Sequence, residues 1–121
     1  MSYNDAWIGV DLDGTLAHYE KFIHASHIGE PIALMVERVI AWRRSGKTVK
    51  IFTARISHDG SPERVKEAIV ARVAIEDWCK RHLGEVLPVT NVKDYAMVEL
   101  YDDRCVQVEK NTGRLIGRSS R

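Results

Sequence analysis

The sequence predicts an α/β fold built on a mostly parallel β-sheet. Short apolar runs alternate with longer segments of helical apolar spacing, and polar residues follow several of the apolar runs. Strands that alternate with helices are typical of parallel sheets with right-handed crossovers. The length of 121 residues fits a single domain, 1–121, with one core and no cap domain.

The first half of the chain predicts a strand, a helix and a second strand. Residues 7–10 form a short apolar run before a polar turn, which suits a buried parallel strand. Apolar residues then recur at helical spacing over 32–45. Pro31 is a favourable start for that helix, because a first-turn N–H has no helical partner, and Gly46 is a plausible stop. The second strand is expected at 49–52.

A longer helix is expected from Ser61 to about His82. Ser61 is a suitable N-cap, Pro62 a suitable first helical residue, and Gly84 a suitable C-terminal stop. The expected core face of this helix is formed by Ala68, Ala71, Ile75, Trp78 and Cys79.

Two strands and a hairpin complete the prediction. Residues 86–89 read as a strand in which Pro88 indicates a sheet edge or a strand end. Residues 97–101 read as the fourth strand. Residues 105–108 and 114–116 flank a turn and predict a C-terminal β-hairpin. We expect frayed termini at 1–5 and 117–121.

Composition excludes several classes of protein. The formal net charge of +1 gives no global field that would select nucleic acid. No segment approaches the roughly 18 apolar residues of a membrane span, and no signal peptide is visible. Cys79 and Cys105 lack metal-ligand spacing and indicate a reducing compartment. We therefore expect a cytoplasmic protein without a membrane partner.

A second apolar stripe lies among the charged positions of the long helix and consists of Ile69, Val70 and Val73. Two interpretations remain open. The stripe forms a contact in a homo-oligomer, or neighbouring loops of the same chain cover it.

Polar residues at the predicted strand ends form the candidate site. Asp11 and Asp13 follow the first strand, Thr53 follows the second, and Asp102 and Asp103 follow the fourth. Lys93 lies more loosely, four residues beyond the third. In open parallel sheets, ligands bind outside the carboxyl ends of the strands. These groups are therefore expected to converge although they are far apart in the sequence.

Carboxylates, a hydroxyl and a lysine in one place suit metal-assisted phosphoryl transfer. Mg²⁺ prefers oxygen ligands, which Asp11, the carbonyl of Asp13, and Asp102 or Asp103 would supply. Asp11 would attack phosphorus and Asp13 would act as the general acid and base. The remaining expected contacts to the phosphoryl group come from the hydroxyl of Thr53, the charge of Lys93 and the turn at Gly14.

These four elements resemble the motifs of the haloacid dehalogenase superfamily, in the same chain order. The matching residues are Asp11-Leu12-Asp13-Gly14-Thr15-Leu16, Phe52-Thr53-Ala54-Arg55, Lys93 and Tyr101-Asp102-Asp103. The resemblance covers about residues 7–109. It implies a Rossmann-like three-layer core, a magnesium ion and an aspartyl-phosphate intermediate. The gaps from Asp13 to Thr53 and from Thr53 to Lys93 are too short for a cap domain. The resemblance then implies an uncapped member, closed by a partner subunit or by the loop 17–30, or open to bulky substrates.

A closer resemblance is to the phosphatase domain of phage-type polynucleotide kinases, which removes 3′-phosphates from nucleic-acid ends. It rests on residues 11–17, Thr53-Ala54-Arg55 and Asp102-Asp103-Arg104. It implies that Arg55 helps to bind phosphate and that Arg104 steadies the acidic pair. A salt bridge from Arg55 to Asp59 or Glu63 is the alternative. The expected substrate is thus a phosphorylated small molecule or a nucleic-acid end, and a non-catalytic module that binds metal and phosphate is the competing class.

Overall fold

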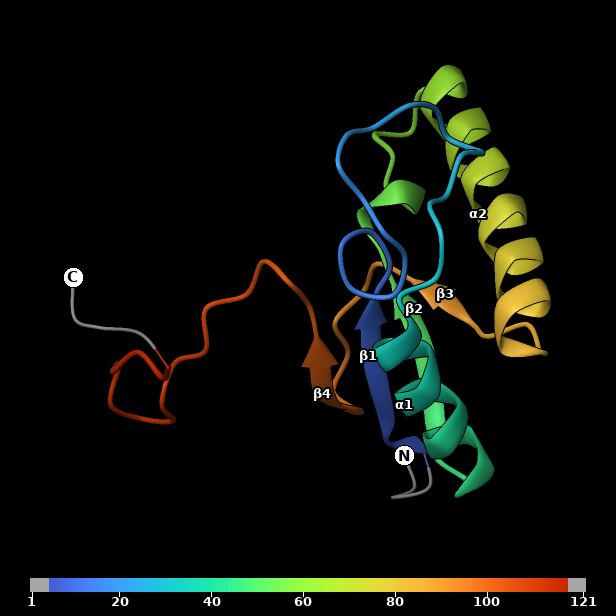
Figure 1. Cartoon of the computed structure of the whole chain (residues 1–121). Helices are drawn as coiled ribbons and strands as arrows, with labels where there is room; N and C mark the ends of the chain where they lie inside the picture. Colours follow the sequence, from blue (N-terminus) through green and yellow to red (C-terminus); the bar gives the residue numbers. More distant parts are fainter. Residues whose placement is uncertain (1–4, 118–121) are drawn as a thin grey trace.

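The computed structural model describes residues 5–117 and contains a four-stranded, all-parallel sheet. Its elements in chain order are β1 (Trp7–Asp11), α1 (Ala33–Arg44), β2 (Thr48–Phe52), the 3₁₀ turn η2 (Ala54–Ile56), α2 (Pro62–Leu83), β3 (Val89–Thr90) and β4 (Met97–Tyr101). The spatial order is β3-β2-β1-β4 (Figure 1). The predicted α/β class is confirmed, and the all-parallel sheet flanked by helices is compatible with a Rossmann-like fold.

The hydrophobic core joins both helices to one face of the sheet. Side chains that alternate along β1 and β2 meet residues of α1 and α2 in a single buried cluster, whose members include Ile8, Val10, Val49, Ile51, Met35, Val39, Ile75 and Trp78. Alternate residues of a strand point to opposite faces, so the even-numbered residues of β1 and the odd-numbered residues of β2 face the helices. Asp11 consequently ends β1 on the opposite face.

Helix α2 follows the sequence prediction closely. Ser61 is its N-cap and accepts a hydrogen bond from the backbone N–H of Arg64, while Gly84 ends it at a φ of 84°. Its buried residues are the five predicted ones, Ala68, Ala71, Ile75, Trp78 and Cys79. The spacing of apolar residues was sufficient to define this face.

Helix α1 begins later than predicted. Its N-cap is Ile32, so Pro31 precedes the helix and is not its first residue. Pro31 instead forms an antiparallel bridge with Ala17, and the N–H of Ile32 donates to the carbonyl of Leu16 at 2.8 Å. This long-range pairing fixes the start of the helix.

The third strand and the C-terminal hairpin are shorter than predicted. The strand comprises Val89–Thr90 rather than 86–89, although it lies at the sheet edge as Pro88 indicated. The hairpin is reduced to an isolated bridge between Val108 and Leu115, beside a hydrogen bond from Glu109 N to Arg114 O of 2.7 Å. This segment leads away from β4 in Figure 1. The termini expected to fray lie almost entirely outside the described residues.

The second apolar stripe of α2 is not covered by the described part of the chain. Ile69, Val70 and Val73 are 59%, 42% and 60% exposed. Cover by neighbouring loops is therefore the wrong interpretation within residues 5–117, and a contact between subunits stays a prediction. No helix of the described residues is long and apolar enough to cross a membrane.

Two isoleucines of α2 provide a matched test of this packing. Ile75 is fully buried and Ile69 is largely exposed. We expect Ile75→Ala to lower the free energy of unfolding by about 2–5 kcal/mol, because it leaves a cavity in the core. Ile69→Ala should change it by less than about 0.5 kcal/mol. Urea denaturation followed by circular dichroism measures both, and similar losses would show that the stripe is buried in solution.

Candidate functional site

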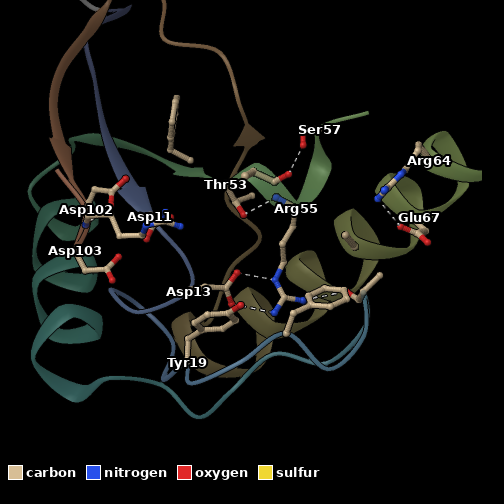
Figure 2. Close-up of a pocket in the computed structure, with 16 residues that line it drawn as sticks. Asp11, Asp13, Tyr19, Thr53, Arg55, Ser57, Arg64, Glu67, Asp102 and Asp103 are labelled. Atoms are coloured by element: carbon tan, nitrogen blue, oxygen red, sulfur yellow. Dashed lines mark hydrogen bonds and ion pairs between the residues drawn. The ribbon is translucent and has the colours of Figure 1, made fainter. Parts of the chain in front are cut away.

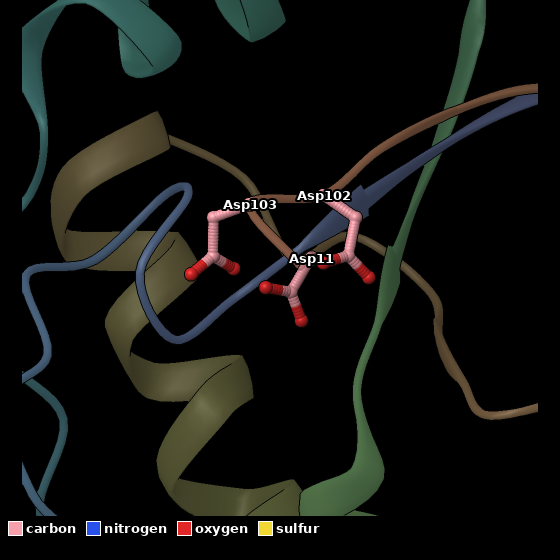
Figure 3. A group of neighbouring side chains, drawn as sticks. All are labelled: Asp11, Asp102 and Asp103. Carbon is pink, nitrogen blue, oxygen red and sulfur yellow. The ribbon is translucent and has the colours of Figure 1, made fainter. Parts of the chain in front are cut away.

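Three carboxylates meet at the carboxyl ends of two neighbouring strands. Asp11 is the last residue of β1, and Asp102 and Asp103 directly follow β4. The two strands pair in parallel, with Val10 beside Tyr101, so their ends lie together. One oxygen from each carboxylate lies within 4.8 Å of the others. Figure 3 shows the three side chains beside one another. The predicted convergence of these residues is therefore present in the structure.

Thr15 links the cluster to the turn that follows β1. Its hydroxyl oxygen lies 3.3 Å from a carboxylate oxygen of Asp11 and 3.3 Å from one of Asp103. The same oxygen accepts a hydrogen bond from the backbone N–H of Asp103 at 3.0 Å. No separate role was expected for Thr15, although it belongs to the first motif. Its position fixes the connection after β4 against the turn after β1.

Crowding makes the ionised form of Asp11 unfavourable in the metal-free protein. Burial, followed by the negative charge of Asp102, raises the pKa of Asp11 from 3.8 to about 7. A divalent cation between the three carboxylates would offset this repulsion, and hard oxygen ligands are those that Mg²⁺ prefers. The donor set therefore fits magnesium.

Gly14 lies directly against this cluster. Its φ is 89°, and a Cβ atom placed on it would lie 2.5 Å from Oδ2 of Asp103. Gly14 thus leaves space for a carboxylate, and its expected contact with phosphate stays a prediction. The glycine also provides the left-handed backbone conformation that the turn requires.

Asp13 points away from the three carboxylates and toward Arg55 (Figure 2). Nε and Nη2 of Arg55 donate to the two carboxylate oxygens of Asp13 at 2.7 and 3.0 Å. The side chains of Arg55 and Asp13 are only 8% and 20% exposed. The alternative partners of Arg55, Asp59 and Glu63, were wrong: the salt bridge is made with Asp13. The backbone carbonyl oxygen of Asp13, not its carboxylate, is the predicted metal ligand, and this assignment stays a prediction.

Thr53 and η2 form another wall of the site. Thr53 is 2% exposed, follows β2 and caps η2, and its Oγ1 accepts a hydrogen bond from the N–H of Arg55 at 3.1 Å. Ala54 lines the same cavity. The hydroxyl of Thr53 is thereby held at the carboxyl end of the sheet, where the sequence predicted it.

One cavity of about 640 Å³ is lined by most of these groups, namely Asp11, Asp13, Thr53, Arg55, Asp102 and Asp103. Sequence reasoning missed several of its walls, which are Tyr19, Phe22, Ala25, Ser57, Arg64, Glu67 and Ala71. Three of them belong to the loop 18–30, which lies within the segment 17–30 where closure of the site was expected. Arg104 also lines the cavity, and its backbone N–H donates to Asp102 at 2.8 Å.

Lys93 is not brought to this cavity. It is exposed on the connection between β3 and β4 and does not line the cavity. Its assignment as a phosphate-binding residue stays a prediction.

The cysteines are poor candidates for a nucleophile. Burial raises the pKa of the Cys79 thiol to about 11. Burial and the negative charge of Asp102 raise the pKa of the Cys105 thiol. A thiol with a raised pKa is less available as thiolate, so neither cysteine is favoured as a nucleophile.

Asp11 should impose a pH dependence on stability in the absence of divalent cations. Because its pKa is raised in the folded state, the unfolded chain binds fewer protons between about pH 4 and 7, and stability falls as pH rises through this window. The shift corresponds to at most ~4 kcal/mol, and solvent contact reduces it. Asp11→Asn should flatten this profile in chelator-treated protein measured by urea denaturation. An unchanged slope would contradict the raised pKa.

Gly14→Ala tests the space beside Asp103. The added methyl group meets a carboxylate oxygen at 2.5 Å and the backbone is strained, so the acidic cluster must shift. We expect at least a ~10-fold weaker affinity for Mg²⁺ by calorimetry. Gly60→Ala is the matched control, because Gly60 has a φ of 87° and open space around its Cβ position. It shares the backbone strain and should leave metal affinity unchanged.

Comparisons with known proteins support the fold alone. No protein-family model and no curated protein matches the chain. The chain is similar to the solved structure of a conserved protein from Bacteroides thetaiotaomicron, with a TM-score of 0.52 and 23% identity. The similarity covers 82% of this chain and 76% of that chain. At this level of identity the similarity concerns the arrangement of helices and strands.

Proposed function

We propose that this protein is a magnesium-dependent phosphomonoester hydrolase with Asp11 as its nucleophile. The observation that carries the proposal is the cluster of Asp11, Asp102 and Asp103, which lines a cavity together with Thr53 and Arg55. Clustered carboxylates cost free energy unless a cation binds them. A phosphate monoester is anionic, so its approach to a carboxylate nucleophile requires the same cation.

Each residue of the proposed site has a defined task. Asp11 attacks phosphorus through a carboxylate oxygen, and the phosphoryl group passes from the leaving oxygen to Asp11. Thr53 donates its hydroxyl proton to a phosphoryl oxygen. Asp13 protonates the leaving oxygen and then takes a proton from the water that hydrolyses the aspartyl phosphate. Bound Mg²⁺ would supply charge neutralisation, held by Asp11, Asp102, Asp103 and the carbonyl of Asp13.

A nucleic-acid end phosphatase is the second candidate. The cavity is open, and it carries Arg64 and Arg104 together with Tyr19 and Phe22. Arginine binds phosphate and aromatic rings stack on bases, so these residues suit the end of a polynucleotide. The test compares two substrates: the nucleic-acid function is supported only if the protein hydrolyses 3′-phosphorylated oligonucleotides faster than small sugar phosphates.

Substitution of the nucleophile tests the main proposal. Asp11→Asn should lower magnesium-dependent hydrolysis of an aryl phosphate by at least ~1,000-fold, because the amide cannot form the aspartyl phosphate. Asp77→Asn is the matched control, since Asp77 is an exposed partner of Arg81 in α2. Robust turnover by the Asp11→Asn variant would exclude Asp11 as nucleophile. Wild-type protein that binds magnesium but hydrolyses no phosphate in a broad panel would instead favour a non-catalytic binding module.

Metal dependence provides a test that does not require a substrate. Mg²⁺ should raise the melting temperature of the wild-type protein, because it binds only where the carboxylates are assembled. Asp102→Asn and Asp103→Asn should each remove most of this rise, whereas Asp77→Asn should retain it. An equal rise in all variants would show that the ion binds elsewhere.

A further inference from the structure

The loop 18–30 is anchored to the body of the protein at its two ends. The N–H of His18 donates to the carbonyl of Glu30 at 2.7 Å, which closes the base of the loop. Gly29 lies so close to His18 that a Cβ atom there would overlap the His18 carbonyl oxygen. The indole of Trp78 donates to the carbonyl of Gly29 at 2.9 Å. The base of the loop is therefore fixed by backbone contacts and by α2.

The tip of the loop contacts the side chain of Arg55, which also lines the site. Nη1 of Arg55 lies 3.3 Å from the carbonyl oxygen of Ala25 and 3.5 Å from that of His24. The guanidinium carbon is 5.6 Å from the centre of the Phe22 ring, within the range of a cation–π contact. Phe22 is 59% exposed, so the ring gains little from burial in the core.

The same guanidinium holds Asp13. Its Nε and Nη2 make the bidentate contact with the carboxylate, while Nη1 faces the loop. A planar guanidinium has its donors in a fixed arrangement, so movement of one partner changes the geometry offered to the other. The position of the loop and the orientation of Asp13 are thereby connected through Arg55.

We propose that Arg55 is a positioning residue that closes the loop 18–30 over the cavity and orients the Asp13 carboxylate in the same step. This role differs from direct binding of phosphate, because Nε, Nη1 and Nη2 of Arg55 already have partners within the chain. Its catalytic part rests on the proposed phosphatase function, whereas its structural part does not. Closure brings Tyr19, Phe22 and Ala25 over the cavity while Asp13 is held for proton transfer.

Hydrogen exchange tests the structural part without substrate. Arg55→Gln should increase amide exchange of the loop 18–30 by at least ~10-fold without a matching increase in α1, because the tip loses its charged donor. Arg55→Lys should restore little of the loop's protection from exchange, because an ammonium group cannot make the bidentate contact with Asp13 and contact the loop at the same time. Arg81→Gln is the control, because Arg81 forms an exposed pair with Asp77. Unchanged exchange in Arg55→Gln would overturn the proposal.

A double-mutant cycle tests the connection between loop and carboxylate. Asp13→Asn should increase exchange of the loop in the wild-type background, but it should add nothing in the Arg55→Gln background. Independent, additive effects would overturn the connection. If the protein is a phosphatase, Arg55→Gln should lower kcat more than it raises KM, and the double variant should be no slower than Asp13→Asn alone. Absence of activity in the wild-type protein would count against the proposed function and leave the exchange result to decide the role of Arg55.

Discussion

Repulsion among three carboxylates is the constraint on which the rest of the site depends. Asp11, Asp102 and Asp103 are held within 4.8 Å because β1 and β4 pair in parallel and end together. The pairing keeps the two strand ends together, and burial of Asp11, followed by the negative charge of Asp102, raises the pKa of Asp11 to about 7. Thr15 and Gly14 complete the arrangement, one by contacting two of the carboxylates and the other by leaving space for Asp103.

The structure distributes the two aspartates of the first motif over different surroundings. Asp11 faces other acids and Asp13 faces a buried arginine, although one residue separates them. Two carboxylates in unlike environments are suited to different tasks, as acid–base pairs in enzymes generally are. The turn after β1 produces this division, because it directs the two side chains to different sides of the cavity.

Apolar spacing and capping residues were sufficient to predict those elements that are determined by residues close together in the sequence. The amphipathic spacing and caps of α2 predicted its bounds within one residue and all its buried positions. Only Val89 of the run 86–89 lies in a strand, because an apolar run also suits a connection whose Leu87 packs into the core. Pro31 failed as a helix start because its neighbour Ile32 hydrogen-bonds to Leu16, a pairing that sequence spacing does not reveal.

The candidate site also has features that the sequence predicts and features that it does not. The acidic cluster could be predicted because strand ends on one side of a parallel sheet converge whatever the details of packing. The partner of Arg55 could not, since Asp13 lies 42 residues away and was expected to serve the metal and the substrate. The exposed position of Lys93 also depends on the path of an irregular connection, for which residue spacing gives no guide.

Because the strands are parallel, the sheet has one end beside the cavity and one end far from it, and labels attached to the two ends would affect the cavity differently. The strands all run in one direction, so the cavity lies at their carboxyl ends and Trp7, Thr48 and Met97 lie at the opposite end. The loop 45–47, which leads into β2, belongs to that distant end. A fluorophore or an immobilising linker attached there would leave the cavity accessible, which makes this loop the practical place to label the protein.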